Sequence, residues 1–209
     1  MKTYQSWGRY PKFIPHSIIR PNWRDEIILS QSEPQLCYGM GRSYGDSCLN
    51  SSGTVIDTTG LSKMIYFNSD TGLLRCESGV TISEIINEYL PLGWFVPVTP
   101  GTKFVTIGGA IANDIHGKNH HRAGNFGNHV IQFELMRSTG ERLLCSRSEN
   151  QELFSATIGG LGLTGMITWA EFHLKKITSS LIETESIKFD SIDEFLELSE
   201  KSEHNYEYS

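Results

Sequence analysis

Four histidines, six glycines and two prolines gather in residues 96–129, a stretch rich in the residue types that ligand chemistry needs. An imidazole exchanges a proton near neutral pH, and glycine lets a ligand approach the backbone closely. His116 stands among these glycines, so it is a candidate for contact with a substrate. A histidine that only packs or hydrogen-bonds there is an equally open interpretation. The spacing of His116, His120 and His121 also suits zinc, but no carboxylate or cysteine is fixed beside them, so we expect no metal site.

The same stretch shows neither the period of a helix nor that of a strand. A long loop without periodicity is usually functional or disordered. Disorder is disfavoured here, because apolar side chains give the segment something to bury. We therefore predict that the stretch is irregular and wraps a ligand; the apolar residues are Val96, Val98, Phe104, Val105, Ile107, Ile111 and Ile115.

A second glycine-rich segment, residues 39–47, follows a short predicted strand at 36–38. A dinucleotide fingerprint of the Rossmann type must open a helix, but residues 46–53 are rich in turn-forming types and have no apolar face. Successive backbone N–H groups of this segment can still hold an anion, and Arg42 adds positive charge. The alternative is a plain glycine turn between strands, although three glycines with Arg42 and Ser43 exceed what a hairpin requires.

The remaining elements form a scaffold that must position these two segments. We predict strands with alternating or short apolar patterns and helices with capping signals, Thr81 with Glu84 and Ser191 with Glu194. The leader up to about residue 23 shows neither period, and a second glycine-rich turn occupies 159–165. The predicted strands are 36–38, 54–57, 64–67, 73–77, 131–137, 142–145, 166–175 and 181–189, with another opening at 205–209; the predicted helices are 82–90, 151–157 and 191–202.

Composition limits the classes of function. A chain of 209 residues with 38% hydrophobic residues can bury a core, and its net charge of -6 argues against a general nucleic-acid binder. No run has the length of a signal peptide or a spanning helix, so we expect a soluble intracellular protein. The four cysteines are far apart without a CxxC pair and are expected to be free thiols.

Four motifs together resemble the vanillyl-alcohol-oxidase superfamily with its PCMH-type FAD-binding domain, and within it the decaprenylphosphoryl-β-D-ribose 2′-oxidases. The likeness runs in order along nearly the whole chain, beginning at Trp7. A long co-linear set of this kind is specific, whereas GxGxxxG alone is weak. The motifs are GMGRSYGD, PVTPGTKFVTIGGAIANDIHGKNHH, GNFGNHV and ELFSATIGGLGLTGMI.

The resemblance implies an α+β fold with FAD between two subdomains. Residues 1–58 would hold the N-terminal arm and the first subdomain, 59–178 the second, and 179–209 the truncated start of a substrate domain. It further implies that Lys118 and Trp7 contact substrate. Around FAD it places Tyr38, Gly39, Met40, Gly41, Arg42, Ser43, Tyr44, Gly45, Asp46 and Ser47 at the pyrophosphate, Gly101, Thr106, Ile107, Gly108 and Gly109 along the dinucleotide, Asn113, Asp114, Ile115 and His116 at the flavin ring, and Ile167 near the adenine.

Members that attach flavin covalently carry histidine in the glycine loop, where this sequence has Arg42. The resemblance therefore implies noncovalent FAD. It also implies oxidation of a secondary sugar alcohol, a polyprenyl-phosphoryl pentose at C2′, to a ketone, with hydride passing to flavin N5 and His116 as a candidate base.

The expected partners are a small-molecule or lipid-linked sugar, a reductase for a two-step epimerisation, and the missing C-terminal half in cis or in trans, with no nucleic acid. The expected location is cytoplasmic, peripheral to the inner membrane face. Two alternatives stay open. One is a free-standing FAD-binding module completed by another polypeptide, and the other is an NADPH-dependent reductase on the same fold.

Overall fold

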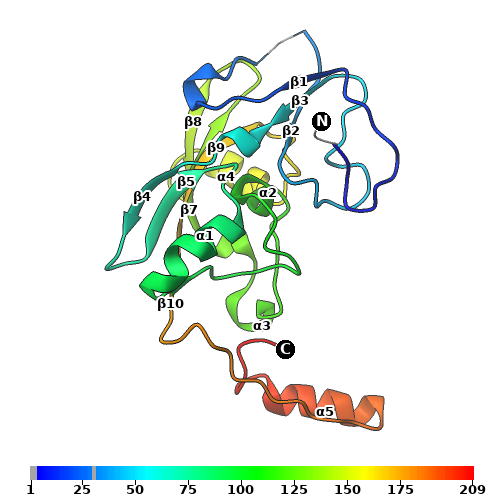
Figure 1. The fold of residues 1–209 in the computed structure, drawn as a ribbon, viewed down its shortest axis with the longest axis vertical. Helices are drawn as coiled ribbons and strands as arrows, with labels where there is room; N and C mark the ends of the chain where they lie inside the picture. Colours follow the sequence, from blue (N-terminus) through cyan, green and yellow to red (C-terminus); the bar gives the residue numbers. More distant parts are fainter. Residues whose placement is uncertain (1–3, 30–31) are drawn as a thin grey trace.

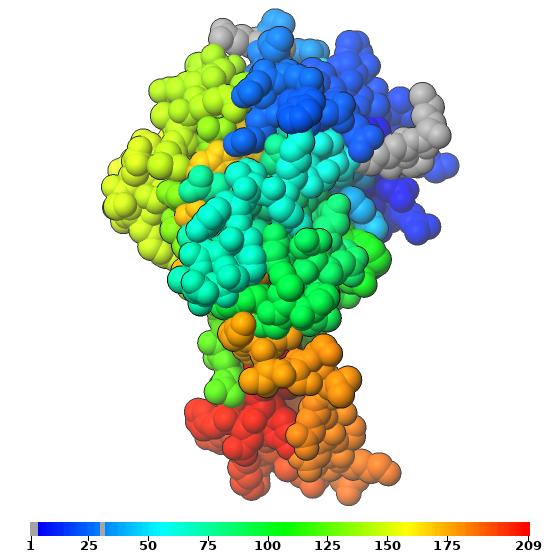
Figure 2. All heavy atoms as spheres, turned by 60° about the vertical axis from the view of Figure 1, so that its left-hand side comes forward, coloured from blue at the N-terminus to red at the C-terminus, as the bar shows by residue number. Residues whose placement is uncertain are grey.

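Two β-sheets form the body of the computed structural model, which describes residues 4–29 and 32–209 (Figure 1). One sheet has three strands and the other has five, and helices pack against the larger one. Residues 179–209, called the C-terminal arm below, form a separate lobe beside this body (Figure 2). The α+β class expected from the sequence is confirmed.

The three-stranded sheet is parallel throughout, with β3 (Thr54–Asp57) between β1 (Ser17–Ile19) and β2 (Gln35–Tyr38). Every residue of β3 is buried, as expected for a central parallel strand. The prediction of a leader without a strand is wrong at β1. Its pairing partner lies far along the chain, and Ile18 and Ile19 are both exposed, so no alternation marks the strand.

The five-stranded sheet is antiparallel, in the order β4-β5-β9-β7-β8. Both predicted hairpins are confirmed, and β9 lies between them. The strand predicted at 166–175 ends early, because β10 (Lys175–Lys176) pairs instead with β6 (Trp94–Phe95). The five strands are β4 (Met64–Asn68), β5 (Leu73–Glu77), β7 (Val130–Met136), β8 (Arg142–Ser146) and β9 (Met166–His173).

Helix α1 (Ile82–Tyr89) begins with the predicted capping box. Thr81 Oγ1 accepts a hydrogen bond from the Glu84 N–H, and the Glu84 carboxylate accepts one from the Thr81 N–H at 2.7 Å. Helix α4 (Gln151–Thr157) also lies where it was predicted. Short 3₁₀ turns occur at η1 (Arg24–Glu26), η2 (Thr58–Gly60), η3 (Leu90–Leu92) and η4 (Phe126–His129).

The stretch 96–129 is less irregular than predicted, because it contains α2 (Ile107–Ala112), α3 (His120–Ala123) and η4. Gly108 and Gly109 weaken the helical signal of α2. Burial outweighs that propensity, since Ile107, Ala110 and Ile111 are fully enclosed in the core.

The main core fills the space between the five-stranded sheet and the helices α1, α2 and α4; its largest buried side chains include Phe126, Phe133, Phe172, Leu74 and Ile85. A smaller cluster joins the two sheets through Ile27, Ile56, Leu61, Met136 and Met166.

The four cysteine thiols are free, as predicted. Within residues 4–29 and 32–209, no helix combines the length and apolar character needed to cross a membrane.

The C-terminal arm differs from its prediction in three places. Residues 181–189 form no strand, because no neighbouring strand supplies hydrogen bonds. Helix α5 (Ile192–Ser202) is present, but its capping box is half formed: Ser191 Oγ caps the Glu194 N–H, while the Glu194 carboxylate accepts from Asp190 N–H at 2.8 Å. Residues 205–209 form no strand either, and the Ser209 N–H donates to the Lys118 carbonyl at 3.0 Å.

Candidate functional site

The glycine-rich loop of residues 39–47 follows directly after β2. The side chain of Tyr38, the last residue of β2, anchors the start of the loop to Gln5. The Tyr38 hydroxyl donates to the Gln5 carbonyl at 2.8 Å and accepts from the Gln5 N–H at 3.1 Å. Burial raises the pKa of Tyr38, which keeps the phenol neutral and able to donate. A Cβ atom at Gly41 would overlap both the Tyr38 hydroxyl and the Gln5 carbonyl, so this position has no room for a side chain.

Helix α2 lies directly against this loop. A Cβ atom at Gly39 would overlap Oγ1 of Thr106, the residue whose side chain caps α2 by accepting from the Gly109 N–H at 3.2 Å. At the other end of the helix, Asn113 Nδ2 donates to the Gly109 carbonyl at 2.9 Å, and its Oδ1 lies 3.5 Å from Ser43 Oγ. The two segments that the sequence singled out are therefore brought together, one along the other.

The opposite side of α2 packs on Ser78, a residue that the sequence analysis missed. The Gly108 N–H donates to the Ser78 carbonyl at 2.8 Å, and a Cβ atom at Gly108 would stand 3.0 Å from Ser78 Cβ. Ser78 Oγ is buried without a hydrogen-bond partner among the described residues. No sequence pattern marks Ser78, because its importance comes only from the approach of α2.

Residues 113–116 leave α2 through a strained turn that is braced by the next segment. Asp114 has a left-handed φ of 40°, and its carboxylate accepts from the Gly127 N–H at 2.9 Å and from Asn125 Nδ2 at 3.1 Å. The Phe126 N–H donates to the Ile115 carbonyl at 2.8 Å, beside a bridge between His116 and Asn125. These contacts fix the backbone that carries His116.

The His116 ring is exposed, and neither of its nitrogens has a hydrogen-bond partner in the described part of the chain. It meets His120 edge to face, with ring centroids 5.6 Å apart. His120 differs from it, because its Nδ1 lies 3.1 Å from the Gly117 carbonyl. His116 therefore has the freer imidazole of this pair. Among residues 4–29 and 32–209, no cluster of three or more histidine, cysteine or acidic side chains could hold a metal ion.

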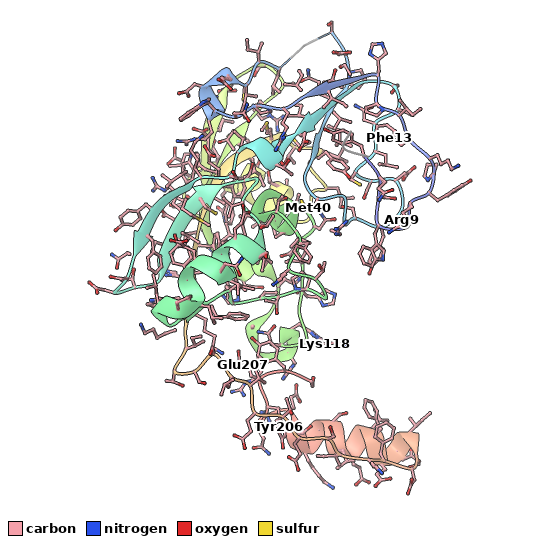
Figure 3. The ribbon with its side chains drawn as sticks, viewed as in Figure 1. Arg9, Phe13, Met40, Lys118, Tyr206 and Glu207 are labelled. Carbon is pink, nitrogen blue, oxygen red and sulfur yellow. The ribbon has the colours of Figure 1, made fainter. Side chains whose placement is uncertain are left out.

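Lys118 and Trp7 contact different segments. The exposed Lys118 lies beside the C-terminal residues, near Tyr206 and Glu207 (Figure 3). Trp7 lies at the glycine loop, where its N–H donates to the Ser43 carbonyl at 3.0 Å and the Arg42 guanidinium stands 5.8 Å from its ring centre. The turn beneath Lys118 is anchored by the buried Asn119, whose Nδ2 donates to the Pro97 carbonyl at 2.9 Å. The sequence analysis also missed Asn119.

The predicted cofactor residues divide by exposure. Arg42, Tyr44, Gly45, Asp46, Gly101 and Asn113 are exposed, and Met40, Ser43, Ser47, Gly108, Gly109, Asp114 and Ile115 are partly so. Ile107 and Ile167 are buried in the main core, so direct contact of their side chains with a cofactor stays a prediction.

The second glycine-rich turn, residues 159–165, supports the C-terminal end of α2, because the N–H groups of Gly159 and Leu161 donate to the Ile111 and Ala112 carbonyls.

The geometry leaves room for an extended FAD. The observation behind this statement is independent of the resemblance. A Cβ atom at Gly45 or Gly101 would meet nothing within 4 Å, so the backbone at both positions faces open space that a ligand can approach. Arg42 can serve as a cation beside the loop, because its guanidinium donates to the Met40 carbonyl of the loop itself at 3.1 Å and forms no ion pair within residues 4–29 and 32–209. Two open surface hollows, of about 430 and 450 Å³, lie elsewhere and are lined by none of the predicted site residues.

Comparison with known proteins agrees with this arrangement. The family model for an FAD binding domain matches residues 27–146, more than half of the chain. The decaprenylphosphoryl-β-D-ribose oxidase of Mycolicibacterium smegmatis is 44% identical over 100% of this chain and 47% of its own length. Cytokinin dehydrogenase 8 of Oryza sativa subsp. indica is 29% identical over 82% of this chain and 36% of its own length. The human Δ(24)-sterol reductase is 29% identical over 54% and 22%.

The chain thus spans less than half the length of each of these relatives. The matched region contains the glycine loop, α2 and His116, which is the part of the fold that the geometry singles out. The resemblance inferred from the motifs is confirmed: the chain belongs to the family of FAD-binding domains of the PCMH type, and FAD is its cofactor.

Proposed function

We propose that this chain is the flavin-binding part of an oxidoreductase that oxidises a secondary sugar alcohol to a ketone. The substrate class we propose is a polyprenyl-phosphoryl pentose, oxidised at C2′. The observation that carries the proposal is the joining of the glycine loop to α2 beside open backbone at Gly45 and Gly101. The 44% identity to an oxidase along the whole chain supports the choice of substrate class.

Different residues of this chain have different roles in the proposed reaction. The loop N–H groups and Arg42 hold the anionic part of the cofactor. The braced turn at Asp114 fixes His116 in position, and its exposed imidazole, with both ring nitrogens unbonded, takes the hydroxyl proton of the substrate. FAD, when bound, accepts the hydride.

Positioning the sugar requires a second wall, because hydride transfer depends on a carbon held at short range in a site that excludes water. We propose that this wall comes from sequence that the relatives have and this chain does not span, acting in cis or in trans. A ketone at C2′ can be reduced from the opposite face, so a reductase partner would complete an epimerisation.

The cofactor claim is tested by titrating the purified chain with FAD while flavin absorbance and fluorescence are followed. We expect saturable binding, and acid precipitation should release the flavin into the supernatant because Arg42 offers no atom for a covalent link. Flavin that stays in the pellet would contradict the noncovalent attachment.

The reaction is tested by anaerobic mixing with a polyprenyl-phosphoryl pentose and following the loss of flavin absorbance. We expect bleaching by a chain extended to the length of the oxidase relative and none by these 209 residues alone. Rapid bleaching by the 209 residues would show that no second wall is needed. An extended chain that binds FAD but is bleached only by NADPH would favour a reductase, the activity named for the sterol relative.

A further inference from the structure

Asn119 is the N-cap residue of α3, but its side chain does not cap that helix. An asparagine in this position usually accepts a hydrogen bond from a backbone N–H of the first turn through Oδ1. Here the Asn119 amide makes no such bond, and the residue is 0% exposed. Its Nδ2 donates instead to the Pro97 carbonyl at 2.9 Å. The amide therefore joins the turn before α3 to the segment that leads to Gly101.

The backbone at Gly117 shows how closely this turn is held. Gly117 is buried, and a Cβ atom added to it would stand 2.5 Å from the Thr99 carbonyl oxygen and 2.9 Å from Asn119 Oδ1. The backbone thus passes between these two oxygens with no room for a side chain. The Asn119 carbonyl also accepts from the Arg122 and Ala123 N–H groups, at 3.0 and 2.8 Å. The turn is therefore fixed to α3 on one side and to the segment 97–101 on the other.

Asn119 Oδ1 is buried and has no hydrogen-bond partner among the described residues. A buried amide oxygen without a donor is unfavourable, and a Cα–H group such as that of Gly117 is only a weak donor. An apolar side chain of similar size would avoid this cost. It could not donate to the Pro97 carbonyl, however, so the amide serves the position of the turn.

This turn carries the candidate base of the site. His116 directly precedes Gly117, and its side chain is exposed. Pro97 belongs to the segment that continues to Gly101, where the backbone faces open space. The hydrogen bond of Asn119 therefore sets the place of His116 relative to the backbone that is predicted to lie along the cofactor.

We propose that Asn119 is a positioning residue, which holds His116 where the imidazole can take the substrate proton. Asn119 itself touches neither substrate nor cofactor. The inference rests on the proposed function, because it assigns Asn119 a part in the same proton transfer. A base must lie within hydrogen-bond reach of the hydroxyl, and a displacement of about 1 Å can slow such a step about a hundredfold. Removal of the amide should therefore slow the chemical step and leave the cofactor site intact.

The test uses a chain extended to the length of the oxidase relative, loaded with FAD and mixed anaerobically with a polyprenyl-phosphoryl pentose. Rates are expressed per bound flavin, so that a loss of folded protein does not lower them. We expect Asn119→Ala to lower the limiting rate of flavin reduction by about 10- to 100-fold, with FAD affinity unchanged. Gly117→Ala displaces the same turn, because its Cβ would overlap the Thr99 carbonyl, and it should lower the rate in the same way. It replaces Asn119→Ala if that variant does not fold.

The matched control is Asn50→Ala. Asn50 Nδ2 also donates to a proline carbonyl, that of Pro34, at 3.2 Å, and a Cβ atom at Gly53 would overlap both groups. The control therefore removes the same kind of contact at the three-stranded sheet. It should reduce its flavin as fast as the unaltered protein. An equal fall in its rate would overturn the proposal, because the loss of any such contact would then be sufficient.

The double variant His116→Ala/Asn119→Ala distinguishes positioning from a general structural role. If Asn119 acts through His116, the double variant should be no slower than His116→Ala alone. Further slowing of the double variant by more than about threefold would overturn the proposal, since the two effects would then be independent. An unchanged rate in Asn119→Ala would overturn it as well.

The unaltered extended chain tests the proposed function separately. If it binds FAD but the sugar does not bleach it, the proposed oxidation fails. The place of His116 is then measured by NMR of its ring signals in the FAD-loaded 209-residue chain, with His116→Gln used for assignment. Asn119→Ala should shift these signals, and Asn50→Ala should leave them in place. Unshifted His116 signals in Asn119→Ala would overturn the positioning role, whatever the result with the sugar.

Discussion

Gly39 lies against the side chain of Thr106 so closely that a Cβ atom on Gly39 would overlap Thr106 Oγ1 and stand 3.2 Å from Cγ2. The two residues belong to segments that are far apart in the sequence. Their contact joins the end of the parallel sheet to the helix that packs on the antiparallel sheet. The position of the glycine loop relative to α2 therefore depends on the absence of a side chain at residue 39.

This contact predicts a specific double-mutant result. Gly39→Ala should lower the free energy of unfolding by about 1–3 kcal/mol, because the added methyl group overpacks the junction, and FAD affinity should fall with it. Thr106→Ala should cost about 1 kcal/mol, since it removes the cap of α2. Chemical denaturation of the singles and the double measures their coupling. In the Thr106→Ala background the cost of Gly39→Ala should shrink, and simple additivity would contradict the contact.

Substitution of two glycines in the stretch 96–129 can distinguish contact with the cofactor from packing inside the protein. Gly101→Val should weaken FAD binding at least tenfold while leaving thermal stability nearly unchanged, because its Cβ meets nothing within 4 Å. Gly108→Val should lower both, because its Cβ stands 3.0 Å from Ser78. Flavin titration of each folded variant, with its melting temperature, gives both quantities. Full FAD affinity in Gly101→Val would show that the open space at residue 101 does not face the cofactor.

His116 and His120 form a natural pair for testing proton transfer. In a chain that reduces its flavin with substrate, His116→Ala should slow reduction by about two orders of magnitude if the imidazole takes the hydroxyl proton. His120→Ala is the matched control, because it removes a neighbouring ring that already lies against the Gly117 carbonyl. Stopped-flow absorbance provides the rates. Equal rates for both variants would leave His116 as a structural neighbour of the flavin.

The raised pKa of Tyr4 predicts that the free energy of unfolding depends on pH in alkaline solution. Burial and its hydrogen bond to Asp57 Oδ2, at 2.9 Å, raise its pKa to about 12. A raised folded-state pKa means that the stabilisation is fully present below the ordinary tyrosine pKa of about 10 and is lost as pH rises towards 12. Tyr4→Phe should cost about 1–2 kcal/mol at pH 7. The difference between the two proteins in urea denaturation should narrow above pH 10, and a constant difference would contradict the assignment.

Local signals predicted much of the scaffold. Local contacts form the capping box at Thr81 and Glu84 and the two hairpins of the larger sheet. These elements could therefore be predicted without knowing which distant segments pack against them. The helix α2 could not, because Gly108 and Gly109 hide it and only the burial of Ile107 and Ile111 stabilises it. A strand at 181–189 was predicted from alternation alone, and alternation cannot supply a neighbouring strand.

The candidate site shows the same division. The glycine loop and His116 were identifiable from residue type and spacing. Ser78 and Asn119 were not, because each acts through a contact with a segment about 20 to 30 residues away. The resemblance implies that Trp7 and Lys118 contact substrate, and this stays a prediction; the structure places Trp7 at the loop and Lys118 by the C-terminal residues.

The position of β9 at the centre of the five-stranded sheet has a consequence for synthesis of the chain. Until residues 166–173 have left the ribosome, β4–β5 and β7–β8 are two separate hairpins with no strand to join them. Pairing β5 with β9 also closes a loop of roughly ninety residues, and such non-local contacts form slowly. The inner edge of β4–β5 therefore stays unpaired while roughly ninety further residues are synthesised, whereas that of β7–β8 waits for only about twenty, and chaperone demand should fall once β9 emerges.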